Sequence, residues 1–383
     1  MYGDLVCGGT PAPEHRAAPA AEGRPVRVGI VSGFFFDHSN WKIPISTWLP
    51  ALSSAFEVHG YYTGVREDEC TAEARALCHR FHAGRSEGEL ATAIVGEAID
   101  VLIYPEIGMN PATTRLAARR LAPVQCASWG HPVTTGFPTM DYFLSSELME
   151  PPGADAHYRE RLVRLPGLSF ACKAPAAVAG ADRREFGLEA DDFVYLCVQN
   201  PSKYLPGFDR LLLSISERVA NARFVFVAGA PGTTAALRRR LDAAFGGHAG
   251  GSHRRVTFLE RLSRPRFRAL HETADAALDP TAWTGCNTTL DAFAAGLPVV
   301  TLPGRFMRGR HTLAFYRRMN HDDLVARDEG HYVELAARLA QDGDWRARQR
   351  QLIADRIHLL HDDDAPARAL VEFVERTARA TRA

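Results

Sequence analysis

The sequence predicts an α/β protein built from two consecutive domains, each around a mostly parallel β-sheet. Three observations predict this class. Short apolar runs typical of buried strands alternate with helical stretches along the chain, the pattern of βαβ units. The chain has 383 residues, of which 46% are hydrophobic, so it is long enough for two cores. A low-complexity stretch, residues 171–181, interrupts the alternation near the middle.

The first domain is expected to begin near Pro25 and to end near Pro166. Its strands are predicted where β-branched and aromatic residues gather, and its helices where apolar residues recur at helical spacing. In chain order these elements are a strand at 26–32, a helix at 50–54, a strand at 57–62, helices near 71–79 and 90–98, a strand at 101–104, a helix at 113–120, and strands at 124–128 and 140–145.

The second domain repeats the alternation after the low-complexity stretch. Its predicted elements are a strand at 193–199, a helix at 208–219, a strand at 223–229, a helix at 233–245, a strand at 255–259, a helix at 265–273, a strand at 274–278, a helix at 290–295 and a strand at 297–302. We therefore expect a flexible segment at 1–24, an N-terminal domain at 25–170, a linker at 171–184, and a C-terminal domain at 185–383 that includes the last helix.

Composition excludes several classes of protein. Forty-five basic and forty-five acidic residues cancel, so no overall charge attracts nucleic acid or a membrane surface. The seven cysteines are scattered and lack the close pairs of a zinc or disulfide framework. No signal peptide and no run of 18 apolar residues is found. We expect a cytoplasmic protein that binds neither nucleic acid nor membrane.

Three residues of the first domain follow predicted strands, where open α/β sheets hold their ligands. His38 follows the first strand and can act as a general base or as a hydrogen-bond donor to a sugar or phosphate. Glu106 follows strand 101–104, and His131 lies in a loop rich in Gly, Pro and Thr. The alternative for each histidine is a loop residue with no ligand. We predict that His38, Glu106 and His131 line the crevice between the domains.

The second domain carries a candidate phosphate site. Gln199 and Lys203 follow strand 193–199, where a lysine can neutralise a phosphate and a glutamine can reach hydroxyl groups. Arg264 opens a later helix and can contact a base or phosphate. Exposed, solvated lysine and arginine side chains are the alternatives.

Residues 279–304 join a polar turn to a helix and then to an apolar strand. Gly285 permits a tight turn, and Asn287, Thr288 and Thr289 supply oxygens that can cap the helix. Free N–H groups at the start of that helix, with the positive end of its dipole, suit a pyrophosphate. The alternative is an ordinary capped helix.

Other motifs are missing from the sequence. The glycine-rich signatures of dinucleotide-binding domains and P-loops do not occur, nor does the G-x-S-x-G turn of hydrolases. The acidic residues 362–364 precede Ala-Pro-Ala and are expected to cap the final helix. We predict no structural metal, no obligatory metal and no cofactor.

Several segments in this order resemble glycosyltransferase family 41, the SPINDLY-like and O-linked N-acetylglucosamine transferase family. The segments that carry the resemblance, which spans about residues 25–370, are RVGIVSGFFFDH, DVLIYPEIGM, LAPVQCASWGHPVTTG, MDYFLSS, VQNPSK and GCNTTLDAFAAGLPVVTLPG. The resemblance implies a GT-B fold of two facing Rossmann-like domains. It also implies an enzyme that transfers a sugar from a nucleotide diphosphate, with inversion and without a metal, to a serine or threonine hydroxyl.

Individual residues match positions that this family uses. His38 matches an active-site histidine, Gln199 and Lys203 match donor and phosphate ligands, and Thr288 and Thr289 match ligands of the diphosphate. The resemblance also implies that Asp291 binds the ribose and that Arg264 lies near the uracil. The donor expected from this resemblance is UDP-N-acetylglucosamine.

Two departures from the family keep other functions open. The sequence shows no tetratricopeptide repeats, which in this family deliver protein acceptors, and Cys286-Asn287 and Phe267 stand where the animal enzymes have histidines. The alternatives are another donor such as GDP-fucose or UDP-glucose, a small-molecule or asparagine acceptor, a sugar 2-epimerase, or a binding module without activity. The expected partners are a nucleotide-sugar donor and a protein or small-molecule acceptor.

Overall fold

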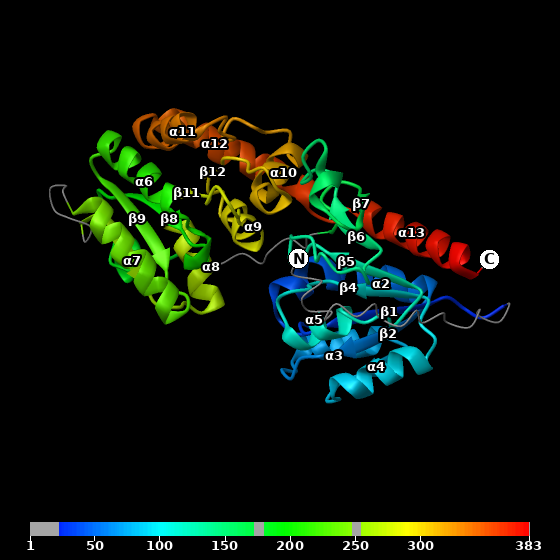
Figure 1. Ribbon diagram of the computed structural model, residues 1–383. Coiled ribbons are helices and arrows are strands. Elements are labelled where there is room, and N and C mark those ends of the chain that lie inside the picture. The colour runs from blue at the N-terminus through cyan, green and yellow to red at the C-terminus, as the bar shows by residue number, and fades with distance from the viewer. Residues whose placement is uncertain (1–22, 172–179, 247–253, 383) are drawn as a thin grey trace. The chain divides into compact units, whose positions relative to one another are not determined.

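The chain folds into two compact units (Figure 1). The computed structural model describes residues 23–171, 180–246 and 254–382. Unit 1 comprises Met1–Cys172 and Asp362–Ala383, and unit 2 comprises Lys173–His361. Most of the predicted segment 1–24, and residues 172–179 of the predicted linker, lie outside the described residues.

Unit 1 is built on a parallel sheet with the strand order β3-β2-β1-β4-β5-β6-β7. Its strands are β1 (Arg27–Ser32), β2 (Glu57–Tyr62), β3 (Arg80–His82), β4 (Val101–Tyr104), β5 (Val124–Ser128), β6 (Tyr142–Ser146) and β7 (Arg161–Leu165). The prediction located the inner strands and missed β3 and β7, which form the two edges of the sheet. Edge strands lack the continuous apolar run by which buried parallel strands are recognised.

Capping residues fix where several helices of unit 1 begin. Asp68 and Ser86 each form a capping box, and Asn110 caps a helix whose first residue is Pro111. The helices are a π-helix at Trp41–Ile45, α2 (Ser46–Ala55), α3 (Glu69–Leu77), α4 (Glu87–Gly96), α5 (Pro111–Ala117), the 3-10 turn Ala154–His157, and α13 (Ala365–Arg382).

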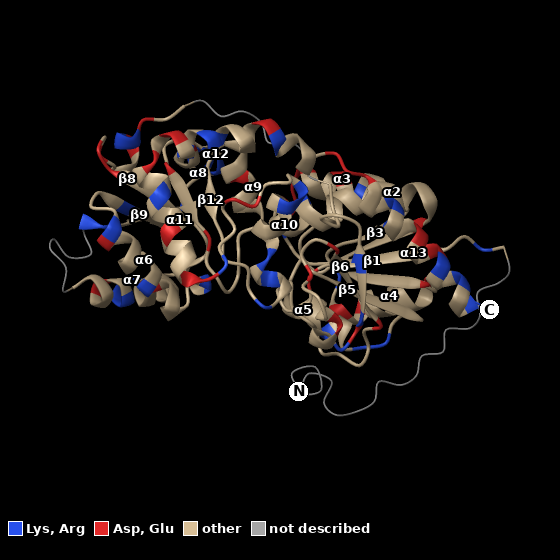
Figure 2. Cartoon of the chain, turned by 90° about the horizontal axis from the view of Figure 1, so that it is seen from above, with Lys and Arg blue, Asp and Glu red and all other residues tan. Residues whose placement is uncertain are grey.

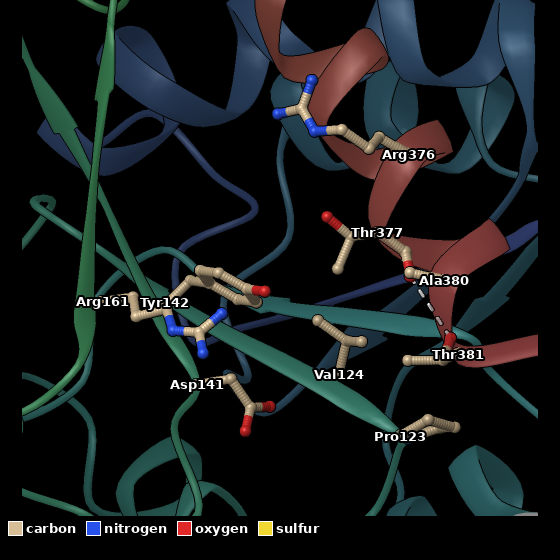
Figure 3. A pocket seen from close by; sticks show the side chains of 9 residues that line it. All are labelled: Pro123, Val124, Asp141, Tyr142, Arg161, Arg376, Thr377, Ala380 and Thr381. Carbon is tan, nitrogen blue, oxygen red and sulfur yellow. Dashed lines mark hydrogen bonds between the residues drawn. The ribbon is translucent and has the colours of Figure 1, made fainter.

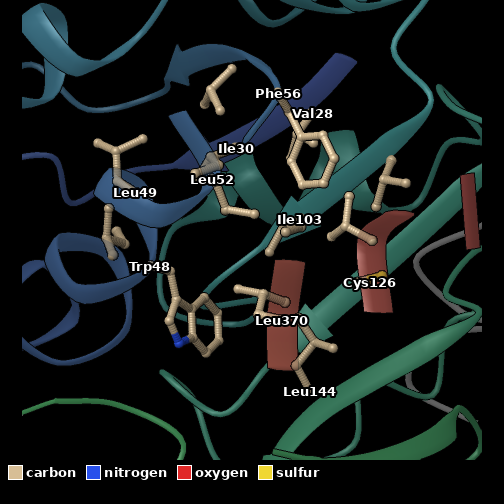
Figure 4. Packing of buried hydrophobic residues seen from close by; sticks show 14 of the residues in the cluster. Val28, Ile30, Trp48, Leu49, Leu52, Phe56, Ile103, Cys126, Leu144 and Leu370 are labelled. Carbon is tan, nitrogen blue, oxygen red and sulfur yellow. The ribbon is translucent and has the colours of Figure 1, made fainter. Parts of the chain in front are cut away.

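The hydrophobic core of unit 1 lies between the sheet, α2 and α13 (Figure 4). Val28, Ile30 and Ile103 from the strands contribute to the same buried cluster as Leu52 of α2 and Leu370 of α13. Residues from the two ends of the chain therefore share one core.

The last helix belongs to unit 1, which corrects the predicted domain at 185–383. Leu370, Phe373 and Val374 of α13 are buried in the core of unit 1, and Arg382 at its end forms an ion pair with Asp100 (2.7 Å). Asp363 accepts a hydrogen bond from the Ala365 N–H (3.1 Å), so the expected cap at the acidic residues is present. The apolar face of α13 gains its burial from a sheet that is distant in sequence.

Unit 2 has a second parallel sheet with the order β10-β9-β8-β11-β12. Its strands are β8 (Phe193–Cys197), β9 (Ala222–Val227), β10 (Val256–Leu259), β11 (Ala276–Leu278) and β12 (Val299–Val300). Its α-helices are α6 (Pro206–Arg218), α7 (Pro231–Phe245), α8 (Arg264–Glu272), α9 (Asn287–Ala294), α10 (His311–Arg318), α11 (Glu329–Gln341) and α12 (Gly343–Arg356). Short 3-10 helices lie at Arg183–Phe186, Pro201–Lys203, Met307–Gly309 and Ile357–Leu360.

The strand order reverses at one point in each sheet. In unit 1 the chain leaves β1 for β2 on one side and returns to β4 on the other, and in unit 2 it does the same from β8 to β9 and then β11. Parallel sheets bind ligands outside the carboxyl ends of the strands at such points. The residues that follow β1, β4, β8 and β11 are therefore the candidates for function.

Basic and acidic residues are interspersed on the helices of both units (Figure 2). The full sequence has 45 residues of each sign. Of the helices that the structure describes, none combines the length and the apolar character needed to span a membrane.

Candidate functional site

Glu106 lies at the strand-order reversal of unit 1 and is fully buried. Its carboxyl group accepts hydrogen bonds from the Ser32 hydroxyl (3.0 Å) and the Gly33 N–H (2.9 Å), which joins the loop after β4 to the end of β1. Burial raises the pKa of Glu106 to about 8, although these two hydrogen bonds oppose the shift. Because its oxygens already bind the protein, Glu106 is placed to hold the two loops together.

His38 lies in the loop after β1, half-buried beside two aromatic rings. Its ring stacks on Phe34, with the ring centroids 4.2 Å apart, and lies 5.6 Å from Phe36. Burial, together with the charge of Lys42, lowers the pKa of His38 to about 4. The Asn40 N–H donates to His38 Nδ1 (3.2 Å), so the neutral ring carries its proton on Nε2. This geometry favours His38 as a hydrogen-bond donor over a general base.

Glycines bring the loops after β1, β4 and β5 close together. A β-carbon at Gly33 would lie 2.5 Å from the Asn110 side chain, and one at Gly108 would lie 3.2 Å from the His131 ring. Gly108 also has a φ of +99°, which favours glycine. His131 is therefore packed against the loop that contains Glu106.

Asn40, in the loop after β1, is a residue near His38 that was not predicted from the sequence. It is 3% exposed and donates from Nδ2 to the sulfur of Met109 (3.4 Å), besides its backbone bond to His38. The available signal was an asparagine in the segment that follows the first strand. Asn40 links the loop of His38 to the loop after β4.

Gln199, Lys203 and Thr288 form one hydrogen-bonded array in unit 2. Lys203 Nζ donates to Gln199 Oε1 (3.0 Å) and to the Thr284 carbonyl (3.3 Å), and Gln199 Nε2 donates to Thr288 Oγ1. Burial lowers the pKa of Lys203, while the Asp279 carboxylate opposes the shift. The predicted phosphate ligands after β8 and at the start of α9 are thus in contact.

The start of α9 differs from the expected cap. The helix begins at Asn287, earlier than the predicted residue 290, and its N-cap is Cys286, whose side chain makes no capping hydrogen bond. The Leu290 N–H makes the first helical bond, to Cys286 O (3.0 Å), so the preceding N–H groups are not part of the helical ladder. The predicted capping by Asn287, Thr288 and Thr289 was wrong because these residues form the first turn itself. Their N–H groups can bind an anion.

Gly285 is required by close packing. A β-carbon there would lie 2.5 Å from Gln199 Nε2 and 2.5 Å from Thr289 Oγ1. The Gly285 N–H donates to Asp279 Oδ1 (2.7 Å), and Thr289 Oγ1 lies 3.1 Å from Thr312 Oγ1. Hydrogen bonds to Asp279, which follows β11, and to Thr312 of α10 therefore fix the turn.

Asp279 and His311 are buried ionisable residues near Lys203 that the sequence analysis missed. Burial raises the pKa of Asp279 to about 6, and burial together with the Lys203 charge lowers the pKa of His311 to about 3. Asp279 follows β11 directly, and a carboxylate at a strand end was the signal for it. Nothing in the local sequence indicated His311.

Asp291 and Arg264 occupy different surroundings. Asp291 forms an ion pair with Arg268 of α8 (3.4 Å). Arg264 is exposed at the first position of α8. Arg268, one turn further along the helix, is therefore the arginine that contacts a predicted ligand of the nucleotide, and a role for Arg264 stays a prediction.

Unit 1 also has a hollow at the opposite end of its sheet from Glu106 and His131 (Figure 3). It measures about 510 Å³ and is bounded by residues at the amino ends of β5, β6 and β7 and by α13. Those residues include Asp141, Tyr142, Arg161 and Thr377. Since Glu106 and His131 follow the carboxyl ends of their strands, this hollow is separate from the candidate site.

Two Rossmann-like units with polar residues at their strand-order reversals define the GT-B glycosyltransferase fold. An O-GlcNAc transferase mutant from Thermobaculum terrenum has a similar structure, with a TM-score of 0.81 and 29% identity over 100% of this chain and 72% of that chain. Anabaena HepE in complex with UDP has a TM-score of 0.56 at 12% identity, covering 92% of this chain and 100% of that chain. The second likeness concerns the fold alone.

The chain belongs to glycosyl transferase family 41, whose sequence pattern matches residues 168–360, just over half of the chain. The tomato (Solanum lycopersicum) relative named "Probable UDP-N-acetylglucosamine--peptide N-acetylglucosaminyltransferase SPINDLY" is 28% identical over 83% of this chain and 35% of its own length. The UDP-glucose:protein N-beta-glucosyltransferase of Actinobacillus pleuropneumoniae is 24% identical over 87% of this chain and 53% of its own length. The chain thus spans about a third to a half of these relatives.

Proposed function

We propose that this chain transfers N-acetylglucosamine from UDP-N-acetylglucosamine to a serine or threonine hydroxyl of a protein, with inversion and without a metal. The observation that carries the proposal is the array of Gln199, Lys203 and Thr288 beside the first turn of α9. It combines a cation with helical N–H groups that lie outside the helical ladder, the chemistry that a diphosphate requires.

The leaving group is the centre of the proposed mechanism. An acceptor hydroxyl attacks the anomeric carbon, the bond from that carbon to the phosphate oxygen breaks, UDP departs with the electron pair, and the proton of the hydroxyl passes to water. Lys203 and the N–H groups of Thr288 and Thr289 would stabilise the charge that develops on the diphosphate. In this proposal they supply the positive charge that metal-dependent transferases take from an ion.

Asp291 would bind the ribose, oriented by its ion pair with Arg268. In unit 1, His38 would donate from Nε2 to an oxygen of the donor or acceptor, since Nδ1 already accepts from Asn40. His131 and Glu106 would shape the loops around His38, with Glu106 acting as a positioning residue because its oxygens bind Ser32 and Gly33.

The names of the relatives support a UDP-sugar donor and a protein acceptor, and they differ in the sugar. The tomato relative is named for UDP-N-acetylglucosamine and the Actinobacillus protein for UDP-glucose. UDP-glucose is therefore the second candidate donor.

Mass spectrometry of released nucleotide tests the proposal. The protein is incubated with UDP-N-acetylglucosamine, UDP-glucose and GDP-fucose, with and without a library of Ser/Thr-containing and Asn-containing peptides. We expect UDP release from UDP-N-acetylglucosamine that rises with Ser/Thr peptides, that is unchanged by a chelator, and that Lys203→Met slows about 10²–10³-fold. Release from GDP-fucose alone, or no release from any donor, would contradict it.

A further inference from the structure

A second group of ionisable side chains lies on the sheet of unit 1. His59 of β2 and His82 of β3 share one face, because the parallel register places His59 beside Arg80 and Tyr61 beside His82. Glu97, which follows α4, covers the same face and contacts both histidines. We call these three residues the His-His-Glu cluster. Glu97 precedes β4, whereas Glu106 follows it, so the cluster is distinct from the candidate site.

The three side chains converge on one point. His59 Nδ1 lies 2.6 Å from Glu97 Oε2, and His82 Nε2 lies 2.9 Å from Glu97 Oε1. One ligand atom from each residue falls within 4.8 Å of the others. The ligand atoms of a tetrahedral zinc site are about 3.3 Å apart, because each lies about 2.0 Å from the ion. Small side-chain rotations therefore suffice to bring the cluster around an ion.

The cluster is shielded from solvent. The side chains of His59, His82 and Glu97 are 4%, 10% and 11% exposed. Imidazole nitrogens and carboxylate oxygens are ligands that Zn²⁺ takes in proteins.

The surroundings can support a bound cation. The Tyr61 hydroxyl donates to Glu97 Oε2 (2.6 Å) and so orients the carboxylate as an outer partner of a metal ligand does. Arg80 contacts the other oxygen of Glu97 (3.2 Å), and its side chain is 65% exposed. Because Arg80 is solvated, it can move into water when a dication takes its place. The competing explanation is a cluster held by hydrogen bonds alone.

We propose that the His-His-Glu cluster binds one Zn²⁺ ion through two imidazole nitrogens, one carboxylate oxygen and a water molecule. The ion would join the short edge strand β3 to β2 and to the end of α4, and so stabilise unit 1. This site differs from the sequence-based expectation of no structural metal, and it takes no part in the proposed transfer reaction.

Metal titration of the untagged full chain tests this proposal. The protein is stripped with a chelator, dialysed, and titrated with Zn²⁺ by calorimetry and with Co²⁺ by visible absorption. We expect one ion per chain, a higher Tm with Zn²⁺, and a Co²⁺ spectrum without the charge-transfer band of a thiolate site. Glu97→Gln and His82→Gln should each weaken Zn²⁺ binding at least about tenfold. The control His358→Asn removes an exposed histidine of unit 2 and should bind as the wild type does.

Two results would overturn the proposal. One is a stripped wild-type protein that takes up no Zn²⁺, and the other is wild-type affinity in both Glu97→Gln and His82→Gln. If the variants fail to fold, as judged by circular dichroism, the wild type alone decides. A crystal soaked in Zn²⁺ should show an anomalous peak among the three side chains, and a peak only elsewhere would leave the cluster as a hydrogen-bonded one.

Discussion

Replacement of Lys203 by methionine tests the proposed diphosphate site. Methionine keeps much of the side-chain volume and removes the charge, together with the hydrogen bonds to Gln199 and to the Thr284 carbonyl. Loss of these hydrogen bonds destabilises the folded protein, whereas removal of a partly buried charge stabilises it. Because the two effects oppose each other, the free energy of unfolding should change by no more than about 1 kcal/mol. The loss of UDP binding can then be measured on a folded protein.

The expected size of the effect follows from the charge that Lys203 supplies. A charge-assisted hydrogen bond contributes about 1.5–3 kcal/mol, equivalent to roughly 10- to 150-fold in affinity. At about 100 times the wild-type Kd, UDP stabilises the wild type by about 2.7 kcal/mol, which raises Tm by roughly 5–10 °C for a unit of this size. A variant that binds 100-fold more weakly gains about 0.4 kcal/mol, a shift of about 1 °C.

Thermal melting with and without UDP is the assay, and Arg239→Met is the matched control. Arg239 is an exposed positive residue of α7 in the same unit, so its loss should leave the UDP shift unchanged. The rate of transfer by Lys203→Met should fall about 10²–10³-fold. A full UDP shift in Lys203→Met, equal to that of the control, would refute the assignment of Lys203 to the diphosphate.

Four further predictions concern other parts of the molecule. Because the folded-state pKa of Glu106 is raised to about 8, this residue keeps its proton in the folded protein between about pH 4.5 and 8, and its own contribution to stability falls as pH rises through that window. Urea unfolding should show that the stability of the wild type relative to Glu106→Gln decreases by roughly 3 kcal/mol from pH 5 to pH 8. Gly285→Ala should weaken UDP binding in calorimetry more than about tenfold, because a β-carbon would lie 2.5 Å from two side chains of the site. In the same assay Arg268→Ala should weaken UDP binding more than Arg264→Ala, and the reverse order would favour Arg264 as the ligand. Leu370→Ala should destabilise unit 1 by about 2–5 kcal/mol in urea unfolding, and unchanged stability would contradict the place of α13 in that core.

The sequence predicted the inner strands well because they carry a strong signal. β2, β4 and β5 begin and end at the predicted residues. β4 is a continuous apolar run, and in β2 and β5 valine and aromatic or small residues stand between turn and helix segments. The edge strands β3 and β7 carry charged residues such as Arg80 and Arg164, which hid them. Pattern alone cannot separate a short edge strand from a loop.

The C-terminal helix shows what local sequence cannot predict. Its apolar face predicts a packed helix, but the choice of unit depends on strands β1 to β7, which all lie before residue 166. The ion pair of Arg382 with Asp100 likewise joins positions that nothing in the local sequence relates. The domain prediction failed there for that reason.

The candidate site was predictable to the extent that its residues follow strands or begin a helix. Gln199, Lys203 and Thr288 do so, and the structure brings them into contact. Asp279 and His311 were missed because their importance comes from burial next to Lys203, which only the fold reveals. The offset of the cap to Cys286 arose because threonine and asparagine are common both at caps and in first turns.

A crystal structure of the chain with UDP would locate the bound diphosphate. We expect its oxygens within hydrogen-bond distance of Lys203 Nζ and of the Thr288 or Thr289 N–H at the start of α9. A diphosphate bound away from that turn, with Lys203 still bonded to Gln199 and Thr284 as it is in the free protein, would contradict this expectation.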